Sequence, residues 1–208
     1  MKRRMVAMLA VVLSPGLIAP LALSQTKDVF VPLFVYRTGP YAINGVPIAN
    51  GFIDYFRLIN ERDGGINGIR IAWEECETQY DASKAMECYE RLKDRGPVLV
   101  NPYSTGFAYQ LVPRAPLDRI PVVTLGHGMA AAADGRWFPW QFNLPTSYWS
   151  QVSAVIRYIG QKEGGMEKLN GKKIAHIFLN NPYGKEPSPT LEALARRFGF
   201  RLTQLAVN

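Results

Sequence analysis

Apolar runs and amphipathic stretches alternate along most of the chain. Residues Val29–Tyr36 form a continuous apolar run, as expected for a strand buried on both faces of a parallel sheet. From about Pro47 to Arg62 the apolar side chains recur at helical spacing, and Pro47 suits the first turn of a helix. Further strands are predicted near 69–75, 98–101, 121–125, 140–144, 174–179 and 200–207. Further helices are predicted near 81–94, 104–117, 152–159 and 186–198.

This order of elements predicts an α/β fold. Strands separated by helices form βαβ units, which build a parallel sheet flanked by helices. Ligands of such sheets bind at the carboxyl ends of the strands. Functional residues are therefore sought in the loops that follow the predicted strands, at 37–46, 76–80, 101–105, 125–135 and 180–185.

Residues 1–24 have the pattern of a secretory signal peptide. Lys2, Arg3 and Arg4 form a basic start, an apolar run follows, and the small residues near Ser24 suit a cleavage site. The alternative is a transmembrane anchor, but prolines interrupt the stretch and its longest apolar run is too short to cross a bilayer. We therefore expect an exported, soluble mature protein.

The charge balance changes once this leader is set aside. The 208 residues include 24 Lys and Arg against 17 Asp and Glu, a net charge of +7 that first suggests nucleic acid or a membrane. Without the leader the balance is +4, and the basic residues are scattered with no aromatic platforms between them, so no nucleic-acid partner is predicted. A hydrophobic content of 48% excludes a disordered chain.

The chain has two cysteines, Cys76 and Cys88. Cys76 ends a predicted strand and Cys88 lies on the inward face of the helix that follows. Because an exported protein meets an oxidising compartment, a disulfide between them is the favoured prediction. Such a bridge would stabilise the fold by roughly 3 kcal/mol in the entropic view. The alternative is a pair of buried free thiols.

No sequence signature of catalysis stands out. The glycine-rich nucleotide motifs, the serine-hydrolase elbow and the zinc-protease motif are all missing from the sequence. Gly126-His127-Gly128 superficially resembles an oxyanion loop, but no serine nucleophile stands at the required spacing. We therefore predict neither catalytic residues nor a metal site nor a cofactor.

The loops after the strands instead offer aromatic and hydrogen-bonding groups. Tyr103, Ser104 and Thr105 stand at a predicted helix start, where hydroxyls and free backbone N–H groups would hold an anion such as a carboxylate. The alternative is that Ser104 simply caps that helix. His127 and Tyr183 follow two other strands whose loops converge on the same sheet edge.

Several short motifs, taken together and in order, carry a family resemblance. They are Thr38-Gly39-Pro40-Tyr41, Gly51, Asn60-x-x-x-Gly64-Gly65-Ile66-x-Gly68, Tyr103-Ser104-Thr105, Ile120-Pro121-Val122, Phe142-Asn143-x-x-Pro145, Gln151 and Asn181-x-Tyr183-Gly184. Through them, residues 28–208 resemble the periplasmic solute-binding proteins of branched-chain amino-acid-type ABC transporters. Members of that family have the type I periplasmic-binding fold, in which parallel sheets are flanked by helices.

The resemblance implies an architecture and a role. Two α/β lobes joined by a hinge would trap a ligand on closure, with the first lobe at 25–146 and the start of the second at 147–208. Such a periplasmic receptor delivers a small molecule to an inner-membrane ABC permease and needs no covalent chemistry. Because the family is usually far longer, the chain is expected to be a fragment or a truncated product.

The resemblance also assigns candidate ligand-binding residues. Ser104 and Thr105 would take the ligand carboxylate, and Tyr183 would close from the second lobe. The other expected contacts are Tyr41, Asn44, Tyr103, Gly126, His127 and Gly128.

Two positions depart from the family pattern and bear on the ligand. The family usually has small residues where His127 and Gly128 stand, and often an arginine where Asn143 stands. An imidazole among tyrosines would suit an aromatic acid or an amide better than leucine. Rival interpretations are a ligand sensor of the same fold and an exported α/β hydrolase.

Overall fold

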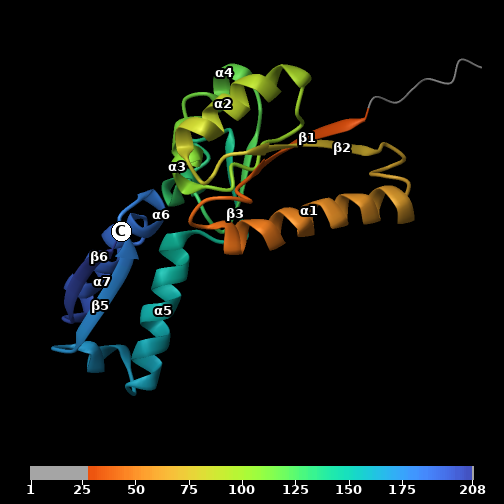
Figure 1. Cartoon of the computed structure of the whole chain (residues 1–208). Coiled ribbons are helices and arrows are strands. Elements are labelled where there is room, and N and C mark those ends of the chain that lie inside the picture. The colour runs from red at the N-terminus through yellow and green to blue at the C-terminus, as the bar shows by residue number, and fades with distance from the viewer. Residues whose placement is uncertain (1–27, 208) are drawn as a thin grey trace, which may run out of the picture.

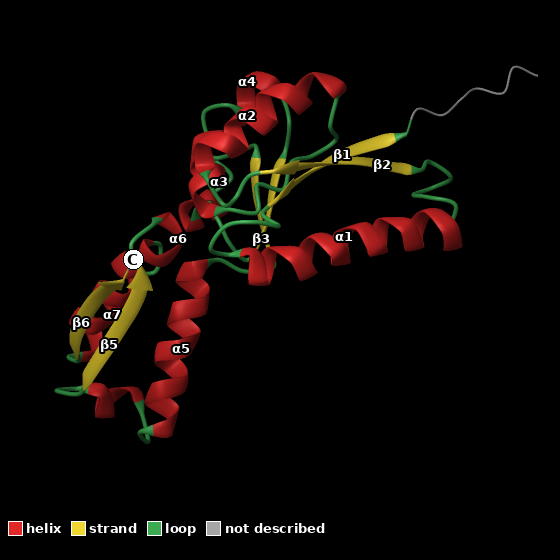
Figure 2. Cartoon of the chain, in the orientation of Figure 1, coloured by secondary structure: helices red, strands yellow, loops and turns green. Residues whose placement is uncertain are grey.

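The computed structural model describes residues 28–207, so the predicted signal peptide lies outside the described residues. The elements form two groups that can be followed in Figure 1. The N-terminal unit runs from β1 (Val29–Val35) to β4 (Gln141–Leu144), and the C-terminal unit runs from α5 (Tyr148–Lys162) to β6 (Arg201–Val207). Each unit combines helices with strands (Figure 2), which agrees with the predicted α/β class.

The N-terminal unit is built on a parallel sheet. β1 pairs with β2 (Ile71–Glu77), and β3 (Val122–Leu125) pairs with β4. The segment predicted as a strand at 98–101 lies between these pairs but forms only single bridges, from Val100 to β3 and from Asn101 to β1. The order across the sheet is therefore β2, β1, this segment, β3 and β4.

A proline in β1 explains why the central segment pairs so briefly. The Val98 N–H donates to the Phe30 carbonyl at 3.1 Å. Pro32 lies two residues further along the same edge of β1, and it has no N–H with which to continue the ladder. The prediction for 98–101 is thus right in place and direction, but wrong in expecting a regular strand.

Helix α1 (Ala42–Arg62) begins five residues earlier than predicted, which corrects the expected start near Pro47. Tyr41 is its N-cap, and the preceding turn closes when the Ala42 N–H donates to the Gly39 carbonyl at 3.2 Å. Pro47 consequently lies in the second turn, where its missing N–H removes one helical hydrogen bond. Asn44, expected in a loop, is a helical residue.

Helix α2 (Ala82–Leu92) follows β2 and is continued by the 3-10 helix η1 (Lys93–Arg95). Asp81 caps it as predicted, because its side chain accepts a hydrogen bond from the Lys84 N–H at 2.9 Å. The disulfide Cys76–Cys88 ties the helix to β2, which confirms the predicted bridge. The predicted inward face is buried throughout and consists of Ala85, Cys88, Tyr89 and Leu92.

The alternating side chains of β1 divide the core of the N-terminal unit into two layers. Phe30 and Phe34 pack with α2 and the disulfide, whereas Leu33 and Val35 pack with α1. Successive strand residues point to opposite faces of a sheet. The sheet is therefore covered by helices on both sides, as a parallel sheet requires.

The helix predicted at 104–117 is split into α3 (Thr105–Leu111) and α4 (Ala115–Asp118). Pro113 falls in the turn between them, where its missing N–H suits a break in the helical ladder. A further 3-10 helix, η2 (Ala130–Ala133), follows β3.

The C-terminal unit has a core of its own. β5 (Lys173–Leu179) pairs in parallel with β6, and Ser147 caps α5 by accepting from the Ser150 N–H. The helix predicted near 186–198 is α7 (Ser188–Phe198), whereas α6 (Pro182–Lys185) forms within 180–185, a segment that was predicted as a loop. The 3-10 helix η3 spans Met166–Leu169. The buried core residues are Ile156, Leu169, Leu191 and Phe200.

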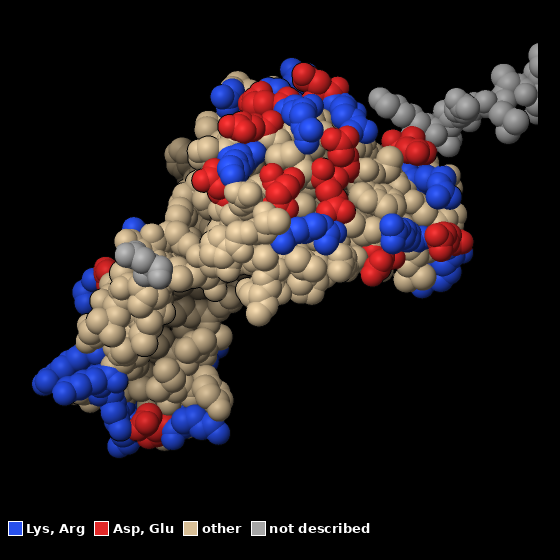
Figure 3. Space-filling view, viewed as in Figure 1, with Lys and Arg blue, Asp and Glu red and all other residues tan. Residues whose placement is uncertain are grey.

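The two cores are separate, but the boundary at 146/147 stays a prediction. On the face shown in Figure 3, charged side chains of both signs mix over the N-terminal unit, and the waist between the units shows none.

Within residues 28–207 no helix has the length and apolarity needed to cross a membrane. The same residues hold no cluster of side chains suited to a metal ion.

Candidate functional site

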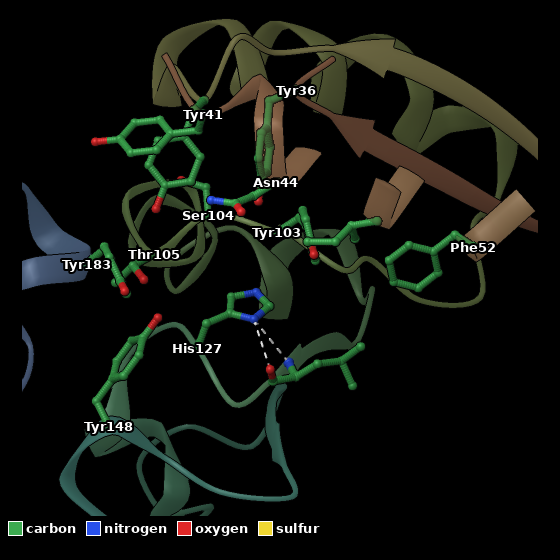
Figure 4. Close-up of a pocket in the computed structure, with 13 residues that line it drawn as sticks. Tyr36, Tyr41, Asn44, Phe52, Tyr103, Ser104, Thr105, His127, Tyr148 and Tyr183 are labelled. Atoms are coloured by element: carbon green, nitrogen blue, oxygen red, sulfur yellow. Dashed lines mark hydrogen bonds between the residues drawn. The ribbon is translucent and has the colours of Figure 1, made fainter. Parts of the chain in front are cut away.

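A cavity of about 380 Å³ lies where the carboxyl ends of the N-terminal strands meet the C-terminal unit (Figure 4). Its walls come from α1, from the segments after β1, β2 and β3, and from the start of α3. The first residue of α5 and one residue of α6 complete it. The lining residues are Tyr36, Tyr41, Asn44, Ile48, Phe52, Tyr80, Tyr103, Ser104, Thr105, Leu125, His127, Tyr148 and Tyr183.

The N-terminal side of the cavity is a wall of touching aromatic rings. Tyr36 stacks on Tyr103 with ring centres 5.3 Å apart, and meets Tyr80 edge-on at 5.1 Å. Tyr80 in turn lies 4.4 Å from Tyr41. Phe52 meets the Tyr103 ring edge-on at 5.9 Å. Because each ring contacts another, the wall has a fixed shape before any ligand enters.

At the start of α3 one hydroxyl caps the helix, and a second remains available to a ligand. Ser104 Oγ accepts a hydrogen bond from the Phe107 N–H at 3.4 Å, so Ser104 does cap the helix. Thr105 is 1% exposed, and its Oγ1 has no hydrogen bond of standard length within the described chain. The Tyr148 hydroxyl points toward it (Figure 4). Apart from this neighbour the buried hydroxyl has no partner among the described residues, and a ligand in the cavity would supply one.

The His127 side chain also has a buried polar atom that is available to a ligand. Its Nδ1 lies 3.3 Å from both the nitrogen and the oxygen of Leu125, while its Nε2 is buried and has no partner within residues 28–207. The ring meets Tyr103 edge-on at 5.7 Å. Burial lowers the pKa of the imidazole below its usual 6.5, and the Leu125 backbone only partly opposes this. The ring is therefore neutral at pH 7 and has one nitrogen available for a ligand.

Neighbouring polar side chains hold the loop that carries His127. Asn143 donates from Nδ2 to the Met129 carbonyl at 2.9 Å and accepts from Thr124 Oγ1 at 2.7 Å. Gln151, on α5, donates to the Gly126 carbonyl at 2.7 Å. Asn143 therefore supports the loop and does not line the cavity.

The C-terminal unit closes one side of the cavity with two tyrosines. The rings of Tyr148 and Tyr183 meet edge-on with centres 5.7 Å apart. Asn181, the N-cap of α6, donates to the Tyr41 hydroxyl at 3.2 Å and so joins the two units. Burial raises the pKa of Tyr148 to about 12, and it also raises the pKa values of Tyr80 and Tyr103. These phenols are uncharged near neutral pH.

Seven of the nine predicted binding residues line one cavity: Tyr41, Asn44, Tyr103, Ser104, Thr105, His127 and Tyr183. Gly126 and Gly128 are outside the lining, although both shape the loop with positive φ values of 75° and 87°. Their role as direct ligand contacts stays a prediction. At Gly128 an added Cβ would lie 2.9 Å from the Thr124 methyl group, which favours glycine there.

Sequence reasoning missed six lining residues, namely Tyr36, Ile48, Phe52, Tyr80, Leu125 and Tyr148. Tyr80 lies in the loop at 76–80, which follows a predicted strand, so its aromatic side chain could have been predicted as a ligand contact. Tyr36 and Leu125 end predicted strands, so their place at the sheet edge was also available. Ile48 and Phe52 look like ordinary core positions of a helix.

The neutral imidazole gives an expected pH dependence. In the unfolded chain His127 gains a proton as the pH falls through about 6.5, whereas the folded state resists protonation. The free energy of unfolding is therefore expected to fall on acidification through this range. Urea unfolding at a series of pH values should show the fall in the wild type and a weaker one in His127→Gln. A slope in His127→Gln equal to that of the wild type and of the control His176→Gln would contradict it.

The chain is similar to known periplasmic binding proteins and to solved structures. The family model for periplasmic binding proteins matches residues 28–207. A structure described as an ABC transporter permease from the Pseudomonas fluorescens group is 42% identical, covers 87% of this chain and 45% of its own, and has a TM-score of 0.75. A branched chain amino acid ABC transporter from Thermus thermophilus with bound valine is 25% identical, with coverages of 86% and 44% and a TM-score of 0.71.

A solute binding protein from Rhodopseudomonas palustris BisB5, in complex with 3,4-dihydroxy benzoic acid, shares the fold at 14% identity. Its TM-score is 0.66, with coverages of 86% and 47%. A search among curated proteins found no match. This chain thus spans just under half the length of these three structures, with 44% to 47% of each covered. Since the family model matches all the described residues, the chain belongs to the periplasmic binding protein family.

Proposed function

We propose that this chain captures a small solute in the cavity between its two units and hands it to an inner-membrane ABC permease. The cavity itself carries the proposal, because separate loops and both units contribute residues to its lining. Family membership and the 42% identical structure described as an ABC transporter permease support it. On this proposal the two units are lobes with a boundary at 146/147, and the chain acts outside the cytoplasm as a receptor without catalysis.

Within this proposal the ligand is an aromatic acid or an amide in preference to an aliphatic amino acid. Seven of the thirteen lining side chains are tyrosine or phenylalanine, and none is Asp, Glu, Lys or Arg. The ammonium group of an amino acid would lack a carboxylate partner among these residues. A flat ring would stack on the aromatic wall, while Thr105 and His127 would hydrogen-bond a carboxylate or carboxamide.

A titration panel tests the ligand class. Calorimetry with 4-hydroxybenzoate, benzamide, leucine and valine should show binding of an aromatic compound and little response to the aliphatic amino acids. Tight binding of leucine with no aromatic response would overturn the assignment of ligand class. No binding of any small solute, including metabolites sought by mass spectrometry in the purified protein, would count against the receptor itself.

Thr105→Val should weaken solute binding with little effect on the stability of the fold. Valine has nearly the same shape as threonine but lacks the hydroxyl that we assign to the ligand, so affinity for the aromatic probe should drop about tenfold. The free energy of unfolding should drop by no more than about 1 kcal/mol, because the Tyr148 hydroxyl is the protein group that faces the native hydroxyl. Thr203→Val, on the exposed surface of β6, is the matched control. Equal affinity of the two variants would exclude Thr105 as a ligand contact.

A further inference from the structure

A buried carboxylate spans the two units outside the cavity wall. Glu186 directly follows α6 in the C-terminal unit and is only 9% exposed. Its Oε1 accepts a hydrogen bond from the Ala130 N–H of the N-terminal unit at 2.6 Å, and its Oε2 accepts one from the Tyr109 hydroxyl on α3. A buried carboxylate needs such donors, because the loss of its hydration is otherwise uncompensated.

Both contacts of Glu186 reach elements that shape the cavity. Ala130 is the first residue of η2 and comes three residues after His127, directly after the loop that brings the imidazole to the cavity. Tyr109 belongs to α3, whose first residue is Thr105. The carboxylate thus connects the C-terminal unit with two parts of the first-lobe wall.

Helix α6 links Glu186 to the part of the cavity wall that contains Tyr41 and Tyr183. Asn181 at its start donates to the Tyr41 hydroxyl at 3.2 Å, and Glu186 follows its end. Tyr183, between these two points, lines the cavity. Gly184 seats the helix on β5, since an added Cβ would overlap the Leu179 carbonyl oxygen. A helix fixed in this way cannot move from the N-terminal unit without breaking the Glu186 contacts.

We propose that Glu186 is a positioning residue that holds the two units together around the cavity. This inference rests on the proposed function for the importance of the cavity, but not for the contact itself. When the units separate, water replaces the Ala130 and Tyr109 donors. When they are together, Glu186 keeps Tyr183 opposite Thr105 and His127. In a variant without the carboxylate, a larger fraction of the molecules has separated units. The apparent solute affinity falls in proportion to the fraction of molecules whose units remain together.

Amide hydrogen exchange measures this contact without any ligand. In Glu186→Ala the Ala130 amide should exchange about tenfold faster, as the loss of a charge-assisted hydrogen bond implies. In Glu186→Gln the rise should be smaller, because the carboxamide oxygen still accepts. The Val123 amide, which donates to Val100 in the central sheet, reports global stability and should not change. Glu61→Ala, at an exposed position of α1, is the control.

A distance measurement tests the positioning role directly. Spin labels at Asp54→Cys on α1 and Lys168→Cys in η3, both exposed, report the separation of the units. Glu186→Ala should shift or broaden their distance distribution relative to Glu186→Gln. An unchanged distribution, an unchanged Ala130 exchange rate, or equal acceleration at Val123 and Ala130 would overturn the proposal. If the wild type binds no solute, the receptor function fails while these two measurements still decide the role of Glu186.

Discussion

Gly45→Ala is expected to lower the free energy of unfolding by about 3 kcal/mol, the upper end of the usual cost of overpacking. Gly45 lies on the face of α1 that crosses the end of β1, and an added Cβ would overlap the backbone carbonyl oxygen of Tyr36. The Tyr36 carbonyl directly follows β1 and belongs to the main chain, so it cannot rotate away as a side chain would, and the helix must shift. Because Tyr36, Ile48 and Phe52 line the cavity, the shift should also weaken solute binding.

Gly51→Ala is the matched control on the same helix. Apart from the adjacent backbone of its own helix, no atom lies within 4 Å of the position that its Cβ would take. Alanine favours a helix over glycine by about 1 kcal/mol, so this variant should be more stable than the wild type. Chemical denaturation of both variants provides the comparison. Equal loss of stability at the two positions would show that α1 does not pack on β1 as described.

Removal of the disulfide should have an effect of similar size. A double variant, Cys76→Ala with Cys88→Ala, is expected to lose about 3 kcal/mol of unfolding free energy, because the unfolded chain regains the entropy that the bridge removes. The two cysteines are 12 residues apart and join β2 to α2 within the main core. Denaturant titration of the double variant measures the loss.

Reduction of the wild type provides the internal comparison for this loss. Reduced wild-type protein should unfold at nearly the same denaturant concentration as the double variant. If the variant and the oxidised wild type were equally stable, the bridge would contribute nothing to folding. If reduction alone left the wild type unchanged, the thiols would not be joined in solution.

The elements that were predicted well are those in which local pattern and tertiary packing agree. The run Val29–Tyr36 is apolar because both faces of β1 are covered, so its pattern alone identifies a central strand. Helix α2 has a side-chain cap at Asp81 and a buried stripe that ends at Leu92, and both are visible in the sequence. The order of strands and helices was sufficient to predict the class of fold.

The errors arise where backbone hydrogen bonding, in a turn or with a neighbouring strand, decides the structure and the hydrophobic pattern does not. The start of α1 depends on the turn between Gly39 and Ala42, and Pro47 gave a misleading signal because prolines favour a first turn. Regular pairing at 98–101 is limited by Pro32, a residue of the neighbouring strand. Neither effect is visible in the local hydrophobic pattern.

The candidate site was predictable from the sheet edge but not from helix surfaces. Tyr41, Thr105 and His127 follow strands or stand at helix starts, so the topology brings them together. Phe52 belongs to the middle of α1 and reaches the cavity only because the helix crosses the strand ends. The cap at Ser104 shows that a hydroxyl in the correct segment can already be engaged by its own helix.

The aromatic wall has a consequence for the kinetics of solute capture. The Tyr36, Tyr80 and Tyr103 rings restrict one another, so their rotational freedom is lost when the chain folds and not when a solute arrives. Binding then carries little of the usual entropy cost of ordering side chains. For a series of related solutes we expect similar association rates, with selectivity expressed in how long each solute remains bound.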